Sequence, residues 1–359
     1  MSSVTSPKVL LMAGGTGGHV FPALALARVL EERSVSVEWL GTASGIEARL
    51  VPDAGIQLHV IQVKGLRGKG LTKLMSAPFV LSKAVWQARS ILRAFNPDVV
   101  VGFGGFASGP GGLAAFLLRK PLLIHEQNAV AGTTNRLLSR LARKVFTAFP
   151  DVFPGAHQVG NPVREEIAAI PKQSKDRGGD RNFRLLVLGG SLGALAINEM
   201  LPATMALLSK TASVDVWHQT GKAHEQTTRD AYEREDIEAN VCAFISDMSA
   251  AYAWADLVVC RSGALTVAEL AAAGRPSILI PFPHAIDDHQ TKNAEWLVNN
   301  GAAELQAQGS MKAEKLQQMI ENLIADRQKL TSMSERALLL AMPDAANQLA
   351  DSCMEVING

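Results

Sequence analysis

The sequence predicts an α/β protein made of two doubly wound, Rossmann-like parallel sheets. Three observations predict this. Short apolar runs alternate with helical patterns along the chain, a stretch rich in Pro, Gly and charge interrupts the pattern near the middle, and a glycine-rich turn follows the first strand on each side of it. Such alternation is typical of parallel sheets with crossover helices. The length of 359 residues also exceeds what one ordinary core holds.

The expected strands are short runs of apolar, often β-branched residues. In the first half they are Lys8–Met12, Ser36–Leu40, Gln57–Val63, Val99–Gly102, Pro121–His125 and Lys144–Ala148. In the second half they are Phe183–Leu188, Val214–Gln219, Val241–Phe244, Leu257–Cys260 and Ser277–Pro281. Stretches with helical periodicity, such as PALALARVLEERS and LTVAELAAAG, separate them.

The interruption is NPVREEIAAIPKQSKDRGGDRNF, which spans 161–183. We therefore expect an N-terminal domain over 1–163 and a C-terminal domain over 164–340. The last helical stretch, about 341–359, follows a proline and is expected to join the N-terminal domain. Ligands of doubly wound sheets bind at the carboxyl ends of the strands, so we expect the active site in the cleft between the domains.

Composition is that of a globular protein, with 47% hydrophobic residues and a mean hydropathy of +0.11. No apolar run approaches the ~18 residues of a membrane span, and the N-terminus has no signal-peptide pattern. Three cysteines form neither a metal-like spacing nor a disulfide framework. A reducing cytoplasm is the expected compartment.

The near-neutral net charge hides an asymmetry. Residues 1–163 hold 17 Lys and Arg against 8 Asp and Glu, whereas 164–359 hold 18 against 26. From 54 to 97 there is no acidic residue, and cations lie among apolar side chains, which suits an anionic membrane surface. An amphipathic helix with a core-facing apolar side explains the segment equally well. Nucleic acid fits poorly because the rest of the chain is acidic. The residues expected at the membrane are Lys69, Lys73, Leu74, Met75, Phe79, Trp86 and Arg89.

Three glycine-rich turns follow expected strands, at 13–18, 102–112 and 188–198. The first fits neither the Rossmann fingerprint, because Val20 stands where glycine is required, nor the P-loop, because it lacks Gly-Lys-Ser/Thr. Backbone N–H groups at a helix N-terminus still make a general anion site. Two such turns in one half and one in the other indicate two phosphate-bearing ligands.

A fourth turn, Arg261-Ser262-Gly263, opens an expected helix near Ala264 that carries Glu269. Free N–H groups and the helix dipole there favour a diphosphate. Glu269 is placed to bridge a ribose diol, or it merely complements the helix N-terminus. Downstream, amides and short acids suit sugar hydroxyls, with a solvated loop as the alternative; they are Asp288, His289, Gln290 and Asn293.

Seven motifs in order are GGTGGHVFP, GFGGFASGPGG, HEQNAVAGTTN, GNPVR, GGSLGA, CRSGALTVAE and DDHQTKNA. This set resembles that of the MurG family, the peptidoglycan N-acetylglucosaminyltransferases of glycosyltransferase family 28. The resemblance runs from Ala13 to about Ala294 and implies a GT-B fold. It also implies an inverting transfer of GlcNAc from UDP-GlcNAc to the 4-hydroxyl of MurNAc in undecaprenyl-diphospho-MurNAc-pentapeptide (lipid I), which gives lipid II.

The resemblance further implies roles for individual residues. Ile245 would bind uracil through its backbone, Glu269 the ribose, and Arg164 the diphosphate. The full implied donor set is Thr16, Gly17, Gly18, Asn128, Arg164, Ser191, Phe244, Ile245, Arg261, Ala264, Leu265, Thr266, Val267, Ala268, Glu269, His289 and Gln290. The acceptor diphosphate would lie on Gly14, Gly15, Gly104, Gly105 and Ser108. The implied partners are UDP-GlcNAc, lipid I, the inner face of an anionic inner membrane, which the protein would bind peripherally, and cell-wall synthesis proteins.

Two positions depart from the family pattern. Phe106 stands where relatives carry tyrosine, so no hydroxyl is available there, and Leu192 stands where some carry glutamine.

An inverting transfer needs a base for the acceptor hydroxyl and a stabilised leaving group. The sequence has no Asp-x-Asp, so neither a bridging metal nor another cofactor is expected; a helix dipole with Arg164 or Arg261 can serve. His19 at a helix N-terminus is the candidate base, since that position keeps a histidine neutral. Glu126 or His125 is the alternative, and His19 could instead only close the turn. Rival functions are a UDP-GlcNAc 2-epimerase, a non-catalytic nucleotide-sugar-binding membrane scaffold, and a transferase acting on a soluble aglycone.

Overall fold

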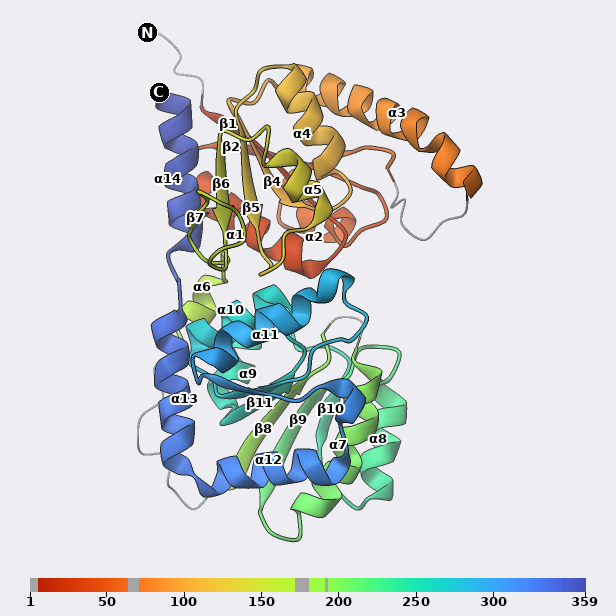
Figure 1. The fold of residues 1–359 in the computed structure, drawn as a ribbon, viewed down its shortest axis with the longest axis vertical. Coiled ribbons are helices and arrows are strands. Elements are labelled where there is room, and N and C mark those ends of the chain that lie inside the picture. The colour runs from red at the N-terminus through yellow and green to blue at the C-terminus, as the bar shows by residue number, and fades with distance from the viewer. Residues whose placement is uncertain (1–5, 64–70, 172–180, 191–192) are drawn as a thin grey trace. The chain divides into compact units, whose positions relative to one another are not determined.

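The computed structural model describes residues 6–63, 71–171, 181–190 and 193–359 (Figure 1). The chain divides into two compact units. Unit 1 comprises residues 1–164 and 342–359, and unit 2 comprises residues 165–341. Each unit is built on its own parallel sheet.

The sheet of unit 1 has the strand order β3-β2-β1-β4-β5-β6-β7, and neighbouring strands run parallel. The strands are β1 Lys8–Ala13, β2 Ser36–Gly41, β3 Gln57–Val60, β4 Val99–Gly104, β5 Leu122–Glu126, β6 Lys144–Thr147 and β7 His157–Gln158. The helices are α1 Gly17–Glu32, α2 Glu47–Asp53, α3 Leu71–Phe95, α4 Ser108–Leu117, α5 Thr133–Leu138 and α14 Ala345–Asn358.

Helices cover both faces of this sheet, which is why its central strands are apolar without interruption. Side chains alternate between the faces of a strand. Val9 and Leu11 of β1 therefore join the core that includes α1 and α14, whereas Leu10 and Met12 join the core that includes α3 and α4. The C-terminal helix α14 thus packs in unit 1, through buried side chains such as Leu349 and Val356 (Figure 1).

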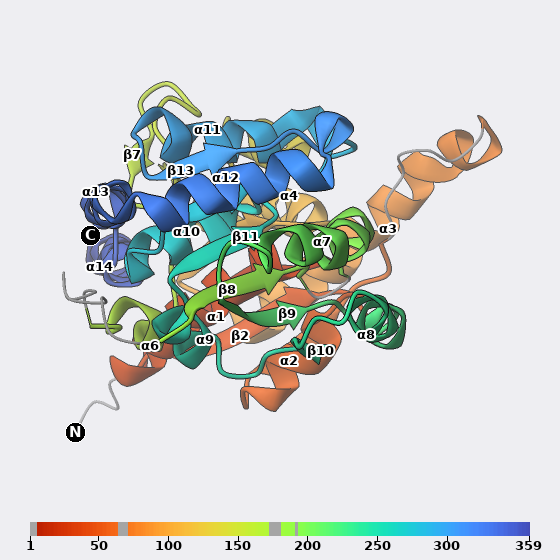
Figure 2. The same cartoon turned by 90° about the horizontal axis from the view of Figure 1, so that it is seen from below.

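Helix α3 is only partly packed. Ala84, Ala88 and Leu92 are buried in the core of unit 1, but the earlier part of the helix projects away from the sheet (Figures 1 and 2). Phe79 and Trp86 on this helix are 80% and 71% exposed. Among the described residues, no helix combines the length and apolar character needed to cross a membrane.

Unit 2 repeats the doubly wound plan with the strand order β10-β9-β8-β11-β12-β13, again with parallel neighbours. The strands are β8 Phe183–Leu188, β9 Val214–Gln219, β10 Asn240–Cys242, β11 Leu257–Cys260, β12 Ser277–Leu279 and β13 Ala303–Leu305. The helices are α6 Glu165–Ala168, α7 Leu195–Leu208, α8 Glu225–Arg234, α9 Met248–Trp254, α10 Ala264–Ala273, α11 His289–Asn299, α12 Ala313–Ala325 and α13 Arg327–Leu340, with short 3₁₀ turns at Ile286–Asp288 and Gln308–Ser310. Helices α7 and α12 lie side by side on one face of the sheet (Figure 2).

The structure confirms the predicted fold class and each predicted strand, with end positions shifted by a few residues. The largest shift is at β3, which ends at Val60 rather than Val63. The sequence analysis missed β7 and β13. Both are short, and β7 is exposed on both residues, so neither carries the apolar run on which the prediction relied.

In both sheets the strand order reverses beside the first strand of the unit. β1 pairs with both β2 and β4, and β8 pairs with both β9 and β11. Connections leave these central strands in opposite directions, and such switch points are where doubly wound proteins bind ligands. The turns after β1, β4, β8 and β11 are the four turns that the sequence analysis singled out.

Candidate active-site residues in each unit

The turn after β1 leads into a helix without a capping side chain. Thr16 is the N-cap of α1 with extended backbone, but its side chain makes no cap hydrogen bond, and the first turn holds no acidic residue. The N–H groups of Gly17 and Gly18 are therefore not satisfied in the usual way. This arrangement suits an anionic ligand at the start of α1.

A buried carboxylate holds the same turn from the side of the sheet. Glu47, at the start of α2, is fully buried and accepts hydrogen bonds from the N–H of Gly15 (2.9 Å), the N–H of Thr42 (3.0 Å) and the hydroxyl of Thr42 (2.7 Å). Gly15 was predicted to bind the acceptor diphosphate, but here its N–H is already hydrogen-bonded. The sequence analysis did not single out Glu47, because only the fold brings it together with its partners Gly15 and Thr42.

The turn after β4 packs directly on the first turn. Gly104 and Gly105 have φ values of +101° and +85°, and a Cβ on Gly105 would lie 2.4 Å from the carbonyl oxygen of Gly14. The buried hydroxyl of Ser108 lies 2.9 Å from the carbonyl oxygen of Met12 and 2.7 Å from that of Gly104. This hydroxyl thus fastens the two turns to each other, and the predicted contact of Ser108 with the acceptor diphosphate stays a prediction.

His19 lies where these two turns meet. It is half-buried in the first turn of α1, and its Nδ1 is 2.7 Å from Oε1 of Gln127. A Cβ on Gly104 would come within 3.2 Å of the imidazole ring. Among the residues that the structure describes, Nε2 of His19 has no hydrogen-bond partner. The ring is thus held on one side and has a nitrogen available on the other.

Glu126, the alternative base, is placed differently. One oxygen of its buried carboxylate accepts from the backbone and side-chain N–H groups of Asn128 (3.0 and 3.3 Å), and the other accepts from Gly132 (3.0 Å) and Asn135 (2.9 Å). Four donors therefore occupy the lone pairs that a base would need. Glu126 holds the loop after β5 in place, and this geometry favours His19 as the base. The contact of Asn128 with the donor, which the family resemblance implies, stays a prediction.

His125 precedes Glu126 and is fully buried. Its Nε2 lies 2.8 Å from the carbonyl oxygen of Gly160, and its Nδ1 lies 2.9 Å from Nε2 of Gln127. The pKa of His125 is lowered to about 4, chiefly by burial; the hydrogen bond to Gly160 opposes this shift, and charge on His19 adds to it. Gln127 connects the two histidines, and the sequence analysis did not single it out.

Arg164 is the last residue of unit 1 before the chain enters unit 2. Its guanidinium carbon lies 5.9 Å from the centre of the Phe21 ring on α1, which is a cation–π distance. Arg164 is therefore near the uncapped end of α1, and its predicted contact with a diphosphate stays a prediction.

The third glycine turn follows β8 in unit 2. Ser191 and Leu192 lie outside the described residues, but the flanking Gly193 has a φ of +79°, and a Cβ there would meet the carbonyl oxygen of Thr220 at 2.2 Å. Asn198 of α7 donates to the same carbonyl oxygen (2.9 Å) and accepts from Nε2 of His218 (3.0 Å). Burial lowers the pKa of His218 to about 3, so this ring braces the turn as a neutral group.

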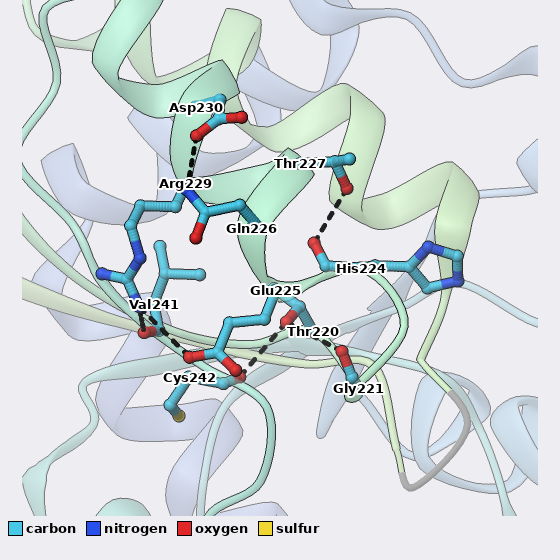
Figure 3. Close-up of polar contacts among 10 residues, drawn as sticks. All are labelled: Thr220, Gly221, His224, Glu225, Gln226, Thr227, Arg229, Asp230, Val241 and Cys242. Carbon is cyan, nitrogen blue, oxygen red and sulfur yellow. Dashed lines mark hydrogen bonds and ion pairs between the residues drawn. The ribbon is translucent and has the colours of Figure 1, made fainter.

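Figure 3 shows how the ends of β9 and β10 are held beside this turn. Arg229 of α8 donates to the carbonyl oxygen of Val241 (2.6 Å) and to Glu225 (3.2 Å), and the hydroxyl of Thr220 lies 3.2 Å from the carbonyl oxygen of Cys242. These contacts fix the backbone that leads to Phe244 and to Ile245, of which Ile245 was predicted to bind uracil through its backbone. Phe244 is 62% exposed, whereas Ile245 is buried.

The helix after β11 begins at Ala264, as predicted, and is uncapped like α1. Gly263 is its N-cap, and the first turn has no acidic residue. By contrast α9, which does not follow a strand of the switch point, is capped by Asp247, whose carboxylate accepts from the N–H of Ala250 (2.9 Å). The start of α10, without a capping side chain, thus keeps the arrangement expected of a diphosphate site. The predicted contacts of Val267 and Ala268 stay predictions.

Glu269, predicted to bind ribose, lies on the buried side of α10. Its carboxylate accepts a hydrogen bond from the hydroxyl of Tyr252 (3.1 Å), and the side chain is 5% exposed. Its distance from the helix start argues against a purely local interaction with the first N–H groups, because that effect falls off within one turn.

The guanidinium group of Arg261 is largely occupied by hydrogen bonds within the protein. Its guanidinium donates to the carbonyl oxygens of Ile280 (3.0 Å) and Pro281 (3.2 Å) and to Oε1 of Gln308 (2.6 Å). It also lies 5.4 Å from the centre of the Phe282 ring, and burial lowers its pKa. The Arg261 side chain therefore holds the segment after β12 in place. These contacts argue against a direct contact between Arg261 and the diphosphate.

The start of α11 is tied to the turn after β11. The backbone carbonyl oxygen of Gln290 accepts from the hydroxyl of Ser262 (2.8 Å), its side-chain Oε1 accepts from the N–H of Phe282 (2.9 Å), and Asn293 donates to the carbonyl oxygen of Ser262 (3.1 Å). His289 is the first residue of α11. These contacts place His289 and Gln290, which were predicted to meet the donor sugar, beside the start of α10, where the donor diphosphate is predicted.

Family models match both halves of the chain. The glycosyltransferase family 28 N-terminal domain matches residues 9–147, and the glycosyltransferase family 28 C-terminal domain matches residues 184–349. The chain belongs to glycosyltransferase family 28. The resemblance inferred from its motifs is thereby confirmed.

Full-length relatives carry one name. The chain is 57% identical to a Chromohalobacter salexigens protein named UDP-N-acetylglucosamine–N-acetylmuramyl-(pentapeptide) pyrophosphoryl-undecaprenol N-acetylglucosamine transferase, over 97% of this chain and 96% of that protein. A Pseudomonas fluorescens protein of the same name is 53% identical over 98% and 99% of the two chains.

Solved structures agree on the fold. The crystal structure of Acinetobacter baumannii MurG matches with a TM-score of 0.85 and 42% identity, covering 97% of this chain and 99% of that one. The calicheamicin glycosyltransferase CalG4 matches with a TM-score of 0.70 at 18% identity, over 99% of both chains, which shows a shared fold only.

Replacing Glu47 tests whether its carboxylate holds the first turn. In Glu47→Gln an amide N–H₂ would face donors that now reach an oxygen, so we expect unfolding free energy to fall by about 2 kcal/mol. The measurement is urea denaturation at neutral pH. Glu32→Gln is the control, since Glu32 is 61% exposed and its i,i+4 pair with Arg28 contributes roughly 0.3 kcal/mol. Equal stability of the two variants would show that the turn does not depend on Glu47.

Proposed function

We propose that this family 28 glycosyltransferase transfers GlcNAc from UDP-GlcNAc to the MurNAc of undecaprenyl-diphospho-MurNAc-pentapeptide, with inversion and without a metal or other cofactor. The observation that carries the proposal is the 57% identity, over nearly the full length of both chains, to a protein named for this transfer. The product is the lipid II precursor of peptidoglycan, so the protein serves cell-wall synthesis.

The two units divide the binding work in this proposal. Unit 2 holds most of the donor: uracil near Ile245, ribose at Glu269 and the diphosphate at the uncapped start of α10. Unit 1 holds the acceptor diphosphate near the turns after β1 and β4. Support comes from the helix starts without capping side chains at both places, which supply N–H donors for phosphate oxygens.

The chemical step requires a proton acceptor and a leaving group. In our proposal Nε2 of His19 takes the proton of the acceptor 4-hydroxyl while that oxygen bonds to the anomeric carbon of GlcNAc. The bond from this carbon to the diphosphate oxygen breaks, and UDP departs with the electron pair. The dipole and N–H groups of α10 stabilise the negative charge that develops on UDP.

The decisive experiment gives the purified protein UDP-GlcNAc with and without a lipid-diphosphate-MurNAc-pentapeptide acceptor and follows UDP release. We expect release only with the acceptor, together with a disaccharide product. Release without acceptor and formation of a ManNAc product would indicate a 2-epimerase. Binding without release would indicate a scaffold, and release with soluble sugars alone would indicate another acceptor class.

Substitution of His19 tests its assignment as the base. We expect His19→Ala to lower kcat by about 10²- to 10⁴-fold, the usual contribution of general base catalysis, with little change in the KM for UDP-GlcNAc. His59→Ala is the matched control, because His59 pairs with Glu38 at the edge of the same sheet (2.6 Å). A near-normal kcat, or a loss confined to donor affinity, would place the base elsewhere.

We further propose that the protein binds the inner face of an anionic membrane peripherally through α3. The projecting, exposed Phe79 and Trp86 lie on the same helix as Lys83, Arg89 and Arg93, and apolar insertion beside cations suits anionic lipid. Such a surface would bring the enzyme to an acceptor whose undecaprenyl chain stays in the bilayer, where other cell-wall synthesis proteins act. Lys69 lies outside the described residues, and nothing is assigned to the side chains of Lys73, Leu74 and Met75.

Charge reversal tests this surface. We expect Lys69→Glu, Lys73→Glu and Arg89→Glu together to weaken binding to phosphatidylglycerol-containing vesicles, since each cation near an anionic surface contributes about 1 kcal/mol. The control reverses three exposed lysines of unit 2, Lys210, Lys222 and Lys312. Cosedimentation with vesicles measures both. Equal binding by the two triple variants would remove α3 as the membrane contact.

A further inference from the structure

A buried chain of hydrogen bonds connects His19 to the backbone of Gly160. It runs from His19 Nδ1 to Gln127 Oε1 (2.7 Å), from Gln127 Nε2 to His125 Nδ1 (2.9 Å), and from His125 Nε2 to the Gly160 carbonyl oxygen (2.8 Å). Gln127 and His125 are 1% and 0% exposed. Each link has one donor and one acceptor, so the identity of the last acceptor decides the direction of the whole chain.

The donor and acceptor of each hydrogen bond can be assigned by starting from Gly160. A carbonyl oxygen only accepts hydrogen bonds, so His125 Nε2 carries a proton and donates it. His125 is neutral near pH 7, because burial lowers its pKa to about 4. A neutral imidazole with a proton on Nε2 has its lone pair on Nδ1. His125 Nδ1 is therefore an acceptor, and it receives an N–H from Gln127.

A second contact fixes the orientation of the Gln127 amide independently. Gln127 Nε2 also lies 3.0 Å from the backbone carbonyl oxygen of His125. With the amide reversed, two carbonyl oxygens would face each other at that distance with no proton between them. The N–H₂ group therefore faces His125, and Oε1 faces His19.

From this geometry we infer that Gln127, braced by His125, is a positioning residue that holds His19 with its proton on Nδ1 and its lone pair on Nε2. Gln127 Oε1 can only accept, so Nδ1 of His19 must donate. The catalytic significance of this tautomer rests on the proposed function, since a base at Nε2 is useful only where a hydroxyl loses its proton. The tautomer itself is a property of the free protein.

The position of His19 agrees with this assignment. Among the described residues, Nε2 has no hydrogen-bond partner, whereas Nδ1 faces the interior of unit 1. Gly104 approaches the Cε1 and Nδ1 atoms of the ring and leaves no room for a side chain there. The one nitrogen that bears the lone pair is thus the one not engaged by the protein, as in histidine bases whose other nitrogen is held by an acceptor.

Nuclear magnetic resonance of the full-length protein labelled with ¹⁵N-histidine tests the inference directly. Protonated and bare ring nitrogens resonate far apart, so long-range ¹H–¹⁵N correlations recorded near pH 8 report the tautomer. Loss of one signal set in His19→Asn identifies His19. We expect the Nδ1–H form in the unsubstituted protein. The Nε2–H form, which free histidine prefers, would overturn the inference without any variant at position 127.

Gln127→Met keeps the length of the side chain but removes all three amide contacts, with His19 Nδ1, His125 Nδ1 and the carbonyl oxygen of His125. We expect His19 to shift toward the Nε2–H form and kcat to fall about 10- to 100-fold, the usual cost of losing the outer partner of a functional histidine. The KM for UDP-GlcNAc should stay within about twofold, since the side chain of Gln127 is buried, only 1% exposed. Gln158→Met on β7, where the amide lies 3.5 Å from the Ala148 carbonyl oxygen, is the matched control and should change neither.

The outcomes separate the inference from the proposed function. An unchanged His19 tautomer in Gln127→Met overturns the inference even where transfer is observed. The Nδ1–H form in a protein that transfers no GlcNAc to the lipid acceptor overturns the proposed function and leaves the tautomer assignment standing. A shifted tautomer with lowered kcat supports both.

Discussion

The pairing of the first strand of each unit with the fourth strand of that unit is the constraint on which both candidate sites depend. β1 beside β4, and β8 beside β11, bring the turns at their carboxyl ends to one point. In unit 1 this leaves so little space that Gly105 lies against the backbone of Gly14, where a Cβ would be 2.4 Å from an oxygen. The sheet topology brings the two turns so close that glycine is required there. The same lack of side chains also lets a ligand approach the backbone.

The polar side chains that hold these turns are buried, on the side of the turns opposite to the candidate ligand sites. Glu47 and Glu126 are both buried, and each carboxylate accepts several N–H or O–H groups from a loop that follows a strand. The helices at the candidate diphosphate sites, α1 and α10, have no capping side chains, which costs about 1 kcal/mol for each helix. Among the described residues of unit 1, polar side chains thus hold the turns from the side of the sheet, whereas the start of α1 has no capping side chain. In the proposed function this arrangement favours binding at the expense of stability.

The fold could be predicted because its signals are local. Apolar strand runs, the glycine turns and the charged break in the middle of the chain are each readable within a few residues, and β7 and β13 were missed where that signal is absent. Site roles were less predictable because they depend on partners distant in sequence. Arg261 turned out to be bound to Gln308, and Gly15 to Glu47. Gln127 stands beside two residues that sequence reasoning did weigh, but only the position of Gly160, 33 residues later, gives its amide a direction.

A neutral amide behind His19 also determines where a proton stays after it is taken up. An acidic partner would raise the pKa of the histidine and keep it protonated, whereas glutamine orients the ring without adding a charge. The chain cannot pass the proton inward, because it ends at a carbonyl oxygen and because charge on His19 lowers the pKa of His125 further. A proton accepted at Nε2 must therefore leave by the same nitrogen, toward solvent or the departing ligand. In the proposed mechanism His19 is therefore a terminal base that returns to its starting tautomer after each turnover, with no relay behind it.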